Sequence, residues 1–282
     1  MTQKIIDFRS RPALLDDFYG ATPGTPSFES ARWLNRRTGS TQDDHFVRSL
    51  TVDGYVAEVR ESGIHRAVVV GRDTPGLRIS NDRIHALTSP HPELIGLASV
   101  DPQTTGVEAA IREVERAVNV LGQKAVNIEP GFGAPALLPD DRLYFPLYEA
   151  CQSLGVPVCL MSGPTTPDLD FNDPAAVGRV ARAFPQLPIV CYHGFYPRAD
   201  EIVGVAFRYE NVYLVPDMYL FAPGGRRYVE AANGVLQDQF LFATSYPFRA
   251  MRQTVDDFLA LGWREEVLPK LLHDNAARLL GL

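Results

Sequence analysis

The sequence has few cysteines, no long apolar run and no excess of basic residues. Its three cysteines are odd in number and follow no metal-binding spacing, so we expect free thiols in a reducing cytoplasm. No segment approaches the roughly 18 apolar residues of a membrane span, and the first ten residues lack the order of a secretory signal. With 27 basic and 34 acidic side chains, the chain offers no basic face for nucleic acid or an anionic membrane. We therefore expect a cytoplasmic protein with neither as a partner.

Glycine-rich, serine-rich and charged linkers are also missing, which favours one domain over residues 1–282. Short β-branched or apolar runs recur along the chain, each followed by a stretch with helical spacing. Several runs are apolar throughout, as expected of parallel strands covered on both faces. The expected strands are residues 4–8, 66–70, 94–100, 124–128, 156–161, 188–192, 212–215 and 240–243.

Helical patterns lie between these strands. The stretch 105–121 carries an apolar stripe and is followed by Gly122, and the stretch 142–154 ends in the same way at Gly155. Eight strands that alternate with helices predict a (β/α)8 TIM barrel. A doubly wound sheet is the alternative, but it would need a glycine-rich phosphate turn after an early strand, and residues 7–12 do not provide one.

Five segments in order along the chain carry a family resemblance. In these segments the sequence is similar to the amidohydrolase-related barrels, which include aminocarboxymuconate-semialdehyde and resorcylate decarboxylases and several lactonases. The resemblance covers nearly the whole chain and implies a barrel fold. The five segments are residues 91–102, 145–150, 154–158, 184–194 and 275–282.

The resemblance also implies a divalent metal, but the chain departs from the family pattern at four ligand positions. Family members usually have two histidines where this chain has Arg9 and Arg11. The strand-five histidine corresponds to Met161, and the strand-eight aspartate corresponds to Ser245. Only the strand-six histidine, His193, is present, and in the decarboxylase branch that histidine acts chiefly in acid–base chemistry. We therefore expect no metal and no other cofactor.

Arg9 and Arg11 change the kind of ion that the site favours. A guanidinium has no free lone pair and stays protonated, so it repels a metal cation and recognises carboxylate or phosphate. At positions i and i+2 of one strand the two side chains face the same side. They either bind an anionic ligand or form ion pairs with acids at neighbouring strand ends, such as Glu129 or Asp217.

The candidate catalytic residues are His193, Glu129 and Asp217, each of which follows a predicted strand. A histidine can titrate near neutral pH and can serve in acid–base chemistry, or it can fill the core as a neutral side chain. Glu129 is a candidate base for activating water, with a solvated loop acid as the alternative. Asp217 has the same two interpretations, and the structural one is slightly favoured.

Further candidates concern substrate binding. Tyr192, Ser245 and Arg249 accompany Arg9 and Arg11 as expected substrate-binding residues. For Asp7, a buried support for Arg9, His193 or a backbone amide is the best interpretation. The connection between residues 11 and 51 is expected to be a lid without regular elements. Together the arginines and nearby aromatic residues would suit a small anionic organic substrate.

Three functions remain open from the sequence. The first is a metal-independent hydrolase of a small carboxylated, lactone-like metabolite, because the resemblance includes a lactonase branch with members that work without a divalent metal. The second is a non-catalytic, anion-binding pseudoenzyme. The third is a decarboxylase or hydrolase with a relocated metal on His193, Asp217 and Glu129. An exposed side of the barrel, such as the helix near Trp263, could support a homo-oligomer.

Overall fold

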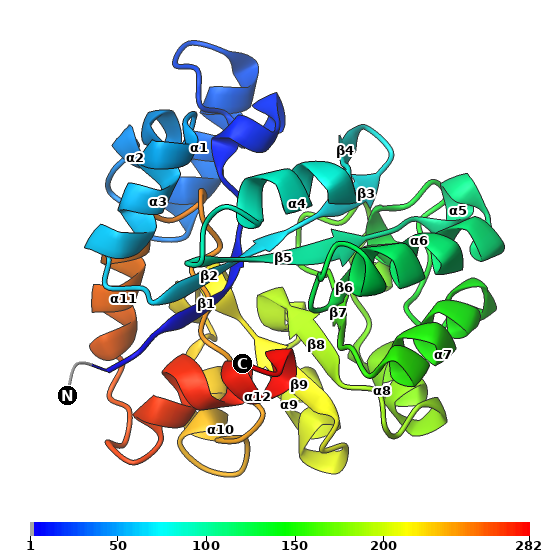
Figure 1. Cartoon of the computed structure of the whole chain (residues 1–282). Helices are drawn as coiled ribbons and strands as arrows, with labels where there is room; N and C mark the ends of the chain where they lie inside the picture. The colour runs from blue at the N-terminus through cyan, green and yellow to red at the C-terminus, as the bar shows by residue number, and fades with distance from the viewer. Residues whose placement is uncertain (1–2) are drawn as a thin grey trace.

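Seven parallel strands form most of a ring in the computed structural model, which describes residues 3–282 (Figure 1). The order around the ring follows the chain, β1-β2-β5-β6-β7-β8-β9. This is the arrangement of a TIM barrel, as the alternation of strands and helices predicts. The strands are β1 (Ile6–Ser10), β2 (Arg66–Val70), β5 (Leu94–Ser99), β6 (Val126–Ile128), β7 (Val158–Leu160), β8 (Ile189–Tyr192) and β9 (Val212–Val215).

The expected eighth strand, residues 240–243, is not a regular strand but occupies the eighth place in the ring. On one side the amide of Leu241 donates to the carbonyl of Leu214 in β9 at 3.0 Å. On the other side the amide of Phe8 in β1 donates to the carbonyl of Phe242 at 2.9 Å. Isolated bridges at Leu214–Phe240 and Ser10–Tyr246 extend the two contacts. The segment 239–246 therefore closes the barrel through few backbone hydrogen bonds.

Helices surround the ring, and their boundaries differ from the predicted ones where a glycine interrupts them. The expected helix 105–121 is divided at Gly106, whose φ of 83° is unfavourable for other residues. The main helices are α1 (Pro26–Arg37), α2 (Asp44–Arg48), α3 (Val52–Glu61), α4 (Asn81–Thr88), α5 (Pro102–Thr105), α6 (Val107–Asn119), α7 (Phe145–Leu154), α8 (Pro174–Ala183), α9 (Ala199–Arg208), α10 (Arg226–Ala232), α11 (Met251–Leu259) and α12 (Asn275–Leu280). A short hairpin, β3 (Arg72–Thr74) with β4 (Leu77–Ile79), follows β2 and was not predicted.

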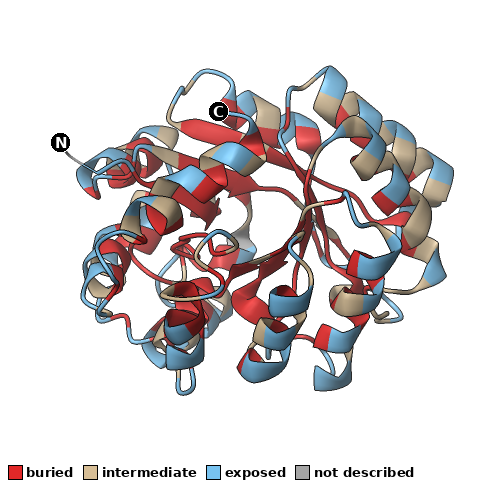
Figure 2. Ribbon diagram, turned by 90° about the horizontal axis from the view of Figure 1, so that it is seen from below, coloured by how far each residue is buried: buried red, intermediate tan, exposed pale blue. Residues whose placement is uncertain are grey.

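The strands are buried on both faces, and alternate residues belong to two separate apolar clusters. Val68 and Val70 of β2 pack inside the barrel with Phe8, whereas Ala67 and Val69 pack against the surrounding helices. This is the period of two expected of a strand. Figure 2 shows the barrel strands largely buried and the surrounding helices exposed on their outer sides.

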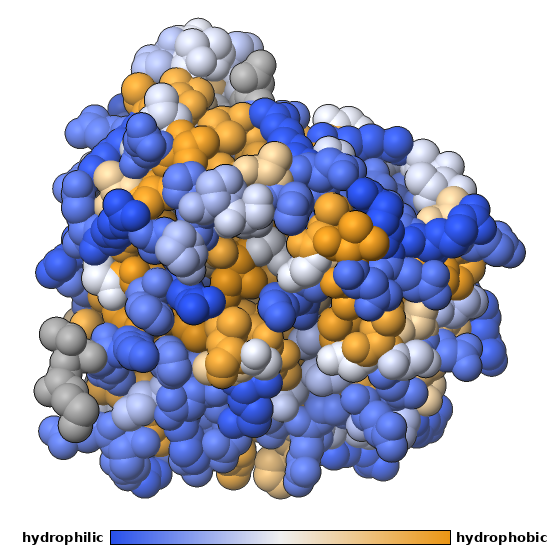
Figure 3. Space-filling model, viewed as in Figure 1, coloured by the Kyte–Doolittle hydropathy of each residue, from blue (hydrophilic) through white to orange (hydrophobic). Residues whose placement is uncertain are grey.

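The connection between β1 and β2 is largely helical, so the expectation of a lid without regular elements was wrong. It contains α1 and α2 and protrudes at the top of Figure 1. Hydrogen bonds tie its later part to the segment after the barrel-closing residues: the Asn35 amide donates to the carbonyl of Phe248 at 3.1 Å, and the Gln253 amide donates to the carbonyl of Gly39 at 3.0 Å. Below this protrusion the surface in Figure 3 is mostly polar with scattered apolar patches.

Two other expectations concern surfaces. The Trp263 side chain belongs to the core, because it is only 9% exposed and its ring packs 4.7 Å from that of Phe258, and the expectation that this side of the barrel supports a homo-oligomer stays a prediction. Within residues 3–282, the structure contains no helix with the length and apolar character of a membrane span.

Candidate functional site

The predicted site residues come together at the end of the barrel where the parallel strands finish, the usual place for TIM-barrel active sites. Three of them have an uncommon backbone conformation: the φ values are 59° at His193, 42° at Asp217 and 62° at Ser245. Non-glycine residues rarely adopt positive φ, and such strain tends to gather at functional sites. These three follow β8, β9 and the closing residues of the barrel, so the strain lies at neighbouring strand ends.

His193 and Asp217 form a buried pair. The Nδ1 atom of His193 lies 2.8 Å from Oδ1 of Asp217, and the carboxylate fixes the tautomer with the proton on Nδ1. Burial lowers the pKa of the His193 imidazole, and Arg9 adds to this effect, so the pKa lies below its ordinary value although Asp217 opposes the shift. His193 is therefore neutral near pH 7, and within the described chain its Nε2 atom has no protein hydrogen-bond partner.

The guanidinium of Arg9 lies beside this pair. Its Nη1 atom donates to the hydroxyl of Ser245 and lies 3.8 Å from Oδ2 of Asp217. Its Nη2 atom lies 3.8 Å from the sulfur of Met161, and the guanidinium carbon is 5.7 Å from the centre of the Tyr192 ring. The Arg9 cation is thus held close to His193, with few strong hydrogen bonds to protein partners.

The residues present do not fit the divalent metal that the family resemblance implies. The Arg9 guanidinium contacts Met161 and Ser245, two of the positions at which the resemblance expects metal ligands. A guanidinium cannot coordinate a cation. Among residues 3–282 no three His, Cys, Asp or Glu side chains are grouped so that they could hold a metal. The relocated site on His193, Asp217 and Glu129 finds no support in this geometry, because Glu129 is bound to arginines instead.

Arg11 is held by protein partners at two of its three guanidinium nitrogens. Its Nε atom donates to the carbonyl of Val70 at 2.8 Å, and its Nη2 atom donates to the carbonyl of Gly71 at 2.9 Å and to Oε1 of Glu129 at 3.2 Å. Both the Arg11 and Glu129 side chains are almost completely buried. The structure therefore separates the two arginines: Arg11 is an ion-pair partner, as one of the two interpretations held, and Arg9 is the one that faces the cavity.

Glu129 is placed to neutralise arginines rather than to activate water. Its Oε1 atom also accepts a hydrogen bond from Asn127 at 2.8 Å, and its Oε2 atom lies 3.0 Å from Nε of Arg72. Burial alone would raise the pKa of the Glu129 carboxyl, but Arg72, Arg11 and Asn127 outweigh it, so the pKa is lowered. A carboxylate held ionised between two cations is a weak base, so its surroundings do not suit Glu129 to the predicted catalytic role.

Asp7 supports the backbone of the site. Its Oδ1 atom accepts hydrogen bonds from the amides of Arg9 at 3.1 Å and Thr244 at 2.9 Å, and its Oδ2 atom bonds the Thr244 hydroxyl. It thereby joins β1 to the closing segment. Burial raises the pKa of the Asp7 carboxyl to about 7, although these hydrogen bonds and Arg9 oppose the shift.

The raised pKa of Asp7 predicts a pH-dependent stability. The folded protein binds a proton at Asp7 that the unfolded chain has already lost, so this contribution to stability is complete below the ordinary carboxyl pKa and disappears as pH rises through about 7. The Asp7→Asn variant has no carboxyl group at this position, so its stability lacks this pH-dependent contribution. We expect the free energy of unfolding of the parent, minus that of the variant, to fall by about 1.4 kcal/mol per pH unit between about pH 5 and 6.5. Urea unfolding of both proteins across this range measures it, and a constant difference would contradict the assignment.

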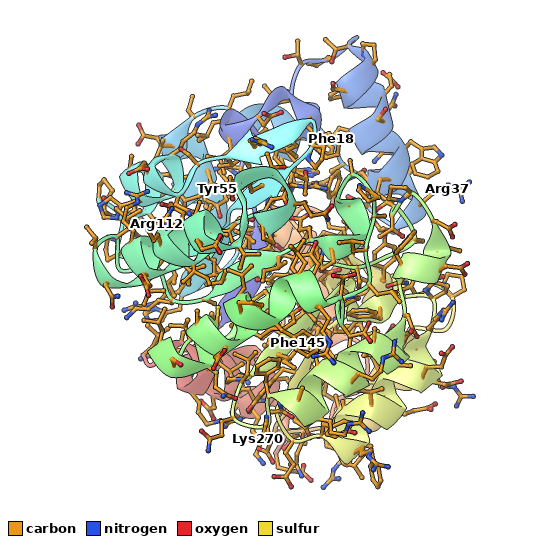
Figure 4. All side chains as sticks on the ribbon, turned by 90° about the vertical axis from the view of Figure 1, so that its right-hand side faces the viewer. Phe18, Arg37, Tyr55, Arg112, Phe145 and Lys270 are labelled. Carbon is orange, nitrogen blue, oxygen red and sulfur yellow. The ribbon has the colours of Figure 1, made fainter. Side chains whose placement is uncertain are left out.

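A cavity of about 790 Å³ opens beside Arg9 and His193. Its volume lies within the range of small-molecule sites. Part of the cavity lining comes from the connection after β1, and this connection therefore covers the end of the barrel. Figure 4 shows Phe18 at the same end of the molecule as Arg37, the last residue of α1. Besides Arg9 and His193, the lining includes Phe18, Trp33, Leu34, Arg72, Phe132, Met161, Thr165, Met218 and Phe248.

Besides Arg11, three predicted substrate-binding residues do not line this cavity. Tyr192 is fully buried beneath Arg9, and its hydroxyl donates to the carbonyl of Phe8 at 3.0 Å. Ser245 is buried and accepts from Arg9. Arg249 is bound to the carbonyl of Thr38 and to Asp257, so it ties the connection after β1 to α11. The structure gives these three supporting contacts, and we do not carry them forward as substrate-binding residues.

Sequence reasoning missed Arg72 and Phe132, which line the cavity. Both follow a strand closely: Arg72 comes two residues after β2, and Phe132 comes four residues after β6. Position just after a barrel strand was a signal that could have indicated them. Met218 carries the same signal, because it comes three residues after β9, whereas Phe18 carries none, because the path of its loop decides its placement.

Comparison with known proteins places this geometry in a family. No curated protein matches the chain with significant sequence similarity. Among solved structures, an uncharacterised TIM-barrel protein from Bordetella bronchiseptica has 33% sequence identity and a TM-score of 0.90, with 99% of this chain and 98% of that chain covered. The likeness therefore extends over the whole barrel and its covering helices.

More distant structures share the fold. A dihydroxybenzoic acid decarboxylase from Polaromonas, solved with bound manganese and 2-nitroresorcinol, has 21% identity and a TM-score of 0.68, with coverage of 99% of this chain and 97% of that one. A 5-carboxyvanillate decarboxylase from Sphingomonas paucimobilis has 17% identity and a TM-score of 0.67, with 99% of each chain covered. The model of the amidohydrolase family matches residues 46–282, most of the chain. This protein therefore belongs to the amidohydrolase family.

Proposed function

We propose that the protein is a metal-independent hydrolase of a small carboxylated cyclic ester, such as a lactone. The observation that carries the proposal is the His193–Asp217 pair beside the Arg9 cation at the buried end of a largely apolar cavity. A base and a cation side by side are the two elements that ester hydrolysis needs from a protein.

His193 supplies the base. It is neutral near pH 7, its Nδ1 proton is held by Asp217, and its Nε2 atom has no partner among the described residues. Nε2 can therefore accept a proton from a water molecule that attacks the ester carbonyl. The bond from the carbonyl carbon to the ring oxygen then breaks, and His193 returns the proton to the departing oxygen. The product is an open-chain hydroxy acid, and His193 ends in its starting state.

Arg9 supplies the charge that stabilises the intermediate. Attack by water places a negative charge on the carbonyl oxygen, and preorganised donors near this oxygen usually contribute the largest part of catalysis. Unlike a metal, a guanidinium cannot coordinate water and make it more acidic. The proposal therefore requires a separate base, which His193 provides.

A chelator experiment tests the proposal. The purified protein is incubated with carboxylated lactones, with and without EDTA, and acid release is followed together with the gain of one water by mass spectrometry. We expect turnover that is the same in both conditions. Turnover that EDTA abolishes and Mn²⁺ restores would contradict the metal-independent mechanism, and binding of the lactones without any turnover would support an anion-binding pseudoenzyme.

Decarboxylation of an aromatic acid is the second candidate. It is favoured by the aromatic residues lining the cavity and by the decarboxylases among the structural neighbours. However, decarboxylation needs a proton for the ring carbon, and a neutral His193 carries none on Nε2. Release of carbon dioxide from 2,6-dihydroxybenzoate by the purified protein would favour this reaction over hydrolysis.

A further inference from the structure

Arg72 is a second cation in the cavity, and its two ends have different surroundings. Its Nε atom lies 3.0 Å from Oε2 of Glu129, although neither atom has a well-directed hydrogen bond. Within residues 3–282 its two terminal nitrogens make no hydrogen bond to protein. The guanidinium carbon lies 5.5 Å from the centre of the Phe18 ring and 5.0 Å from that of Phe132. Arg72 therefore offers a free pair of N–H donors beside two aromatic rings.

The backbone around Arg72 is held firmly. Arg72 begins the hairpin strand β3 and pairs with Ile79. The carbonyl of Gly71, just before it, accepts hydrogen bonds from Arg11 at 2.9 Å and from Asn127 at 3.3 Å. The position of the free donors is thus set by the barrel rather than by a mobile loop.

Among the buried groups at the strand ends, the arginines outnumber the carboxylates that their guanidinium groups contact. Three arginines (Arg9, Arg11 and Arg72) lie beside Glu129 and Asp217, while His193 is neutral and lies among them. The acid in the cavity lining, Glu29, is mostly exposed and lies 3.8 Å from Arg32. Arg11 donates to three protein acceptors, and Arg9 already donates to Ser245. Arg72 is therefore the arginine with a whole fork available, and a fork of two parallel N–H groups matches the two oxygens of a carboxylate.

We infer that Arg72 is the specificity-determining residue of this site and binds the single carboxylate of a planar, cyclic monoanion. The inference rests on the proposed function in one respect: the ligand is oriented with its reacting carbonyl group at Arg9 and His193. The rings of Phe18 and Phe132 contact the apolar body of the ligand, next to its carboxylate. A substrate without a carboxylate leaves the terminal N–H groups of Arg72 without a charged acceptor in the cavity, so the site rejects it.

Benzoate and benzamide test this with calorimetry, because they have the same shape and differ in charge, and neither is the cyclic ester of the proposed reaction. The parent protein is expected to bind benzoate more tightly than benzamide. In Arg72→Met, benzoate affinity should fall by roughly 10- to 100-fold, the usual effect of losing hydrogen bonds to a charged group, with benzamide affinity unchanged. The Arg72→Lys variant keeps the charge but loses the fork of two N–H groups, so its benzoate affinity should lie between those of the parent and Arg72→Met.

Arg78→Met is the matched control. Arg78 belongs to the same hairpin, carries the same charge and pairs with Asp73, but its side chain is half exposed and does not line the cavity. The Arg78→Met variant should bind benzoate with the same affinity as the parent. Equal affinity of the parent for both probes, or an Arg72→Met variant that binds benzoate within twofold of the parent, would overturn the inference. If Arg72→Met fails to fold, Arg72→Lys and the preference of the parent decide. Because no turnover is measured, failure of the hydrolase proposal leaves this result interpretable.

Discussion

Replacing Arg11 by alanine is expected to lower the free energy of unfolding by about 3–5 kcal/mol, the range for breaking a buried ion pair. The variant loses three hydrogen bonds and leaves Glu129 with Arg72 and Asn127 only. It also removes the side-chain donor to the Val70 carbonyl and one of the two side-chain donors to the Gly71 carbonyl. Since folded domains are stable by only about 5–15 kcal/mol, this is a large share. Urea unfolding at pH 7 measures the change.

Arg116→Ala is the control for this prediction. Arg116 forms an ion-pair network with Asp82 and Glu113, but its side chain is more than one-third exposed. Surface pairs contribute about 1 kcal/mol or less, so this variant should unfold nearly as the parent does. An Arg11→Ala protein as stable as the Arg116→Ala protein would show that the buried pair with Glu129 is unimportant for folding.

Replacing His193 by glutamine is expected to reduce kcat by about 10²- to 10⁴-fold, the usual contribution of a general base. The glutamine amide can still donate to Asp217, so the fold should be preserved, but it cannot accept the proton of water. The parent should also show a pH dependence in kcat/KM. Because the base acts in its neutral form and burial lowers its pKa, the rate should fall only below the ordinary histidine range.

His273→Gln is the matched control, since His273 pairs with Asp274 and is partly exposed outside the cavity. It should keep full activity and the same pH profile. A His193→Gln enzyme with an unchanged kcat would exclude His193 as the base, and an acid limb that begins well above the ordinary histidine pKa would contradict the lowered value.

Much of the fold could be predicted because parallel strands covered on both faces leave a strong signal. The runs at residues 66–70 and 212–215 match the observed strands. The closing segment could be located but its irregularity could not, because residues 240–243 are as apolar as a regular strand and no local pattern reveals the positive φ of Ser245 just after them. The helix break at Gly106 was also missed, since a single glycine is tolerated inside many helices.

The candidate site was predictable as a set of strand-end residues, but the role of each was not. Arg9 and Arg11 share a strand face, and parity alone cannot separate them. What separates them is where each long side chain finds acceptors: Arg11 reaches the carbonyls at the end of β2, and Arg9 reaches Ser245. Those acceptors are far away in sequence, so only the tertiary structure distinguishes a scaffold arginine from a cavity arginine.

The positive charge of the site belongs to the Arg9 side chain and not to a bound metal ion. A bound ion has a dissociation constant, so its occupancy varies with concentration and with competing chelators. The cation of Arg9 is part of the polypeptide, is present in every folded molecule at a stoichiometry of one, and is held next to Asp217 and Ser245. Its charge therefore does not depend on any pool outside the protein, and it changes only through mutation or covalent modification.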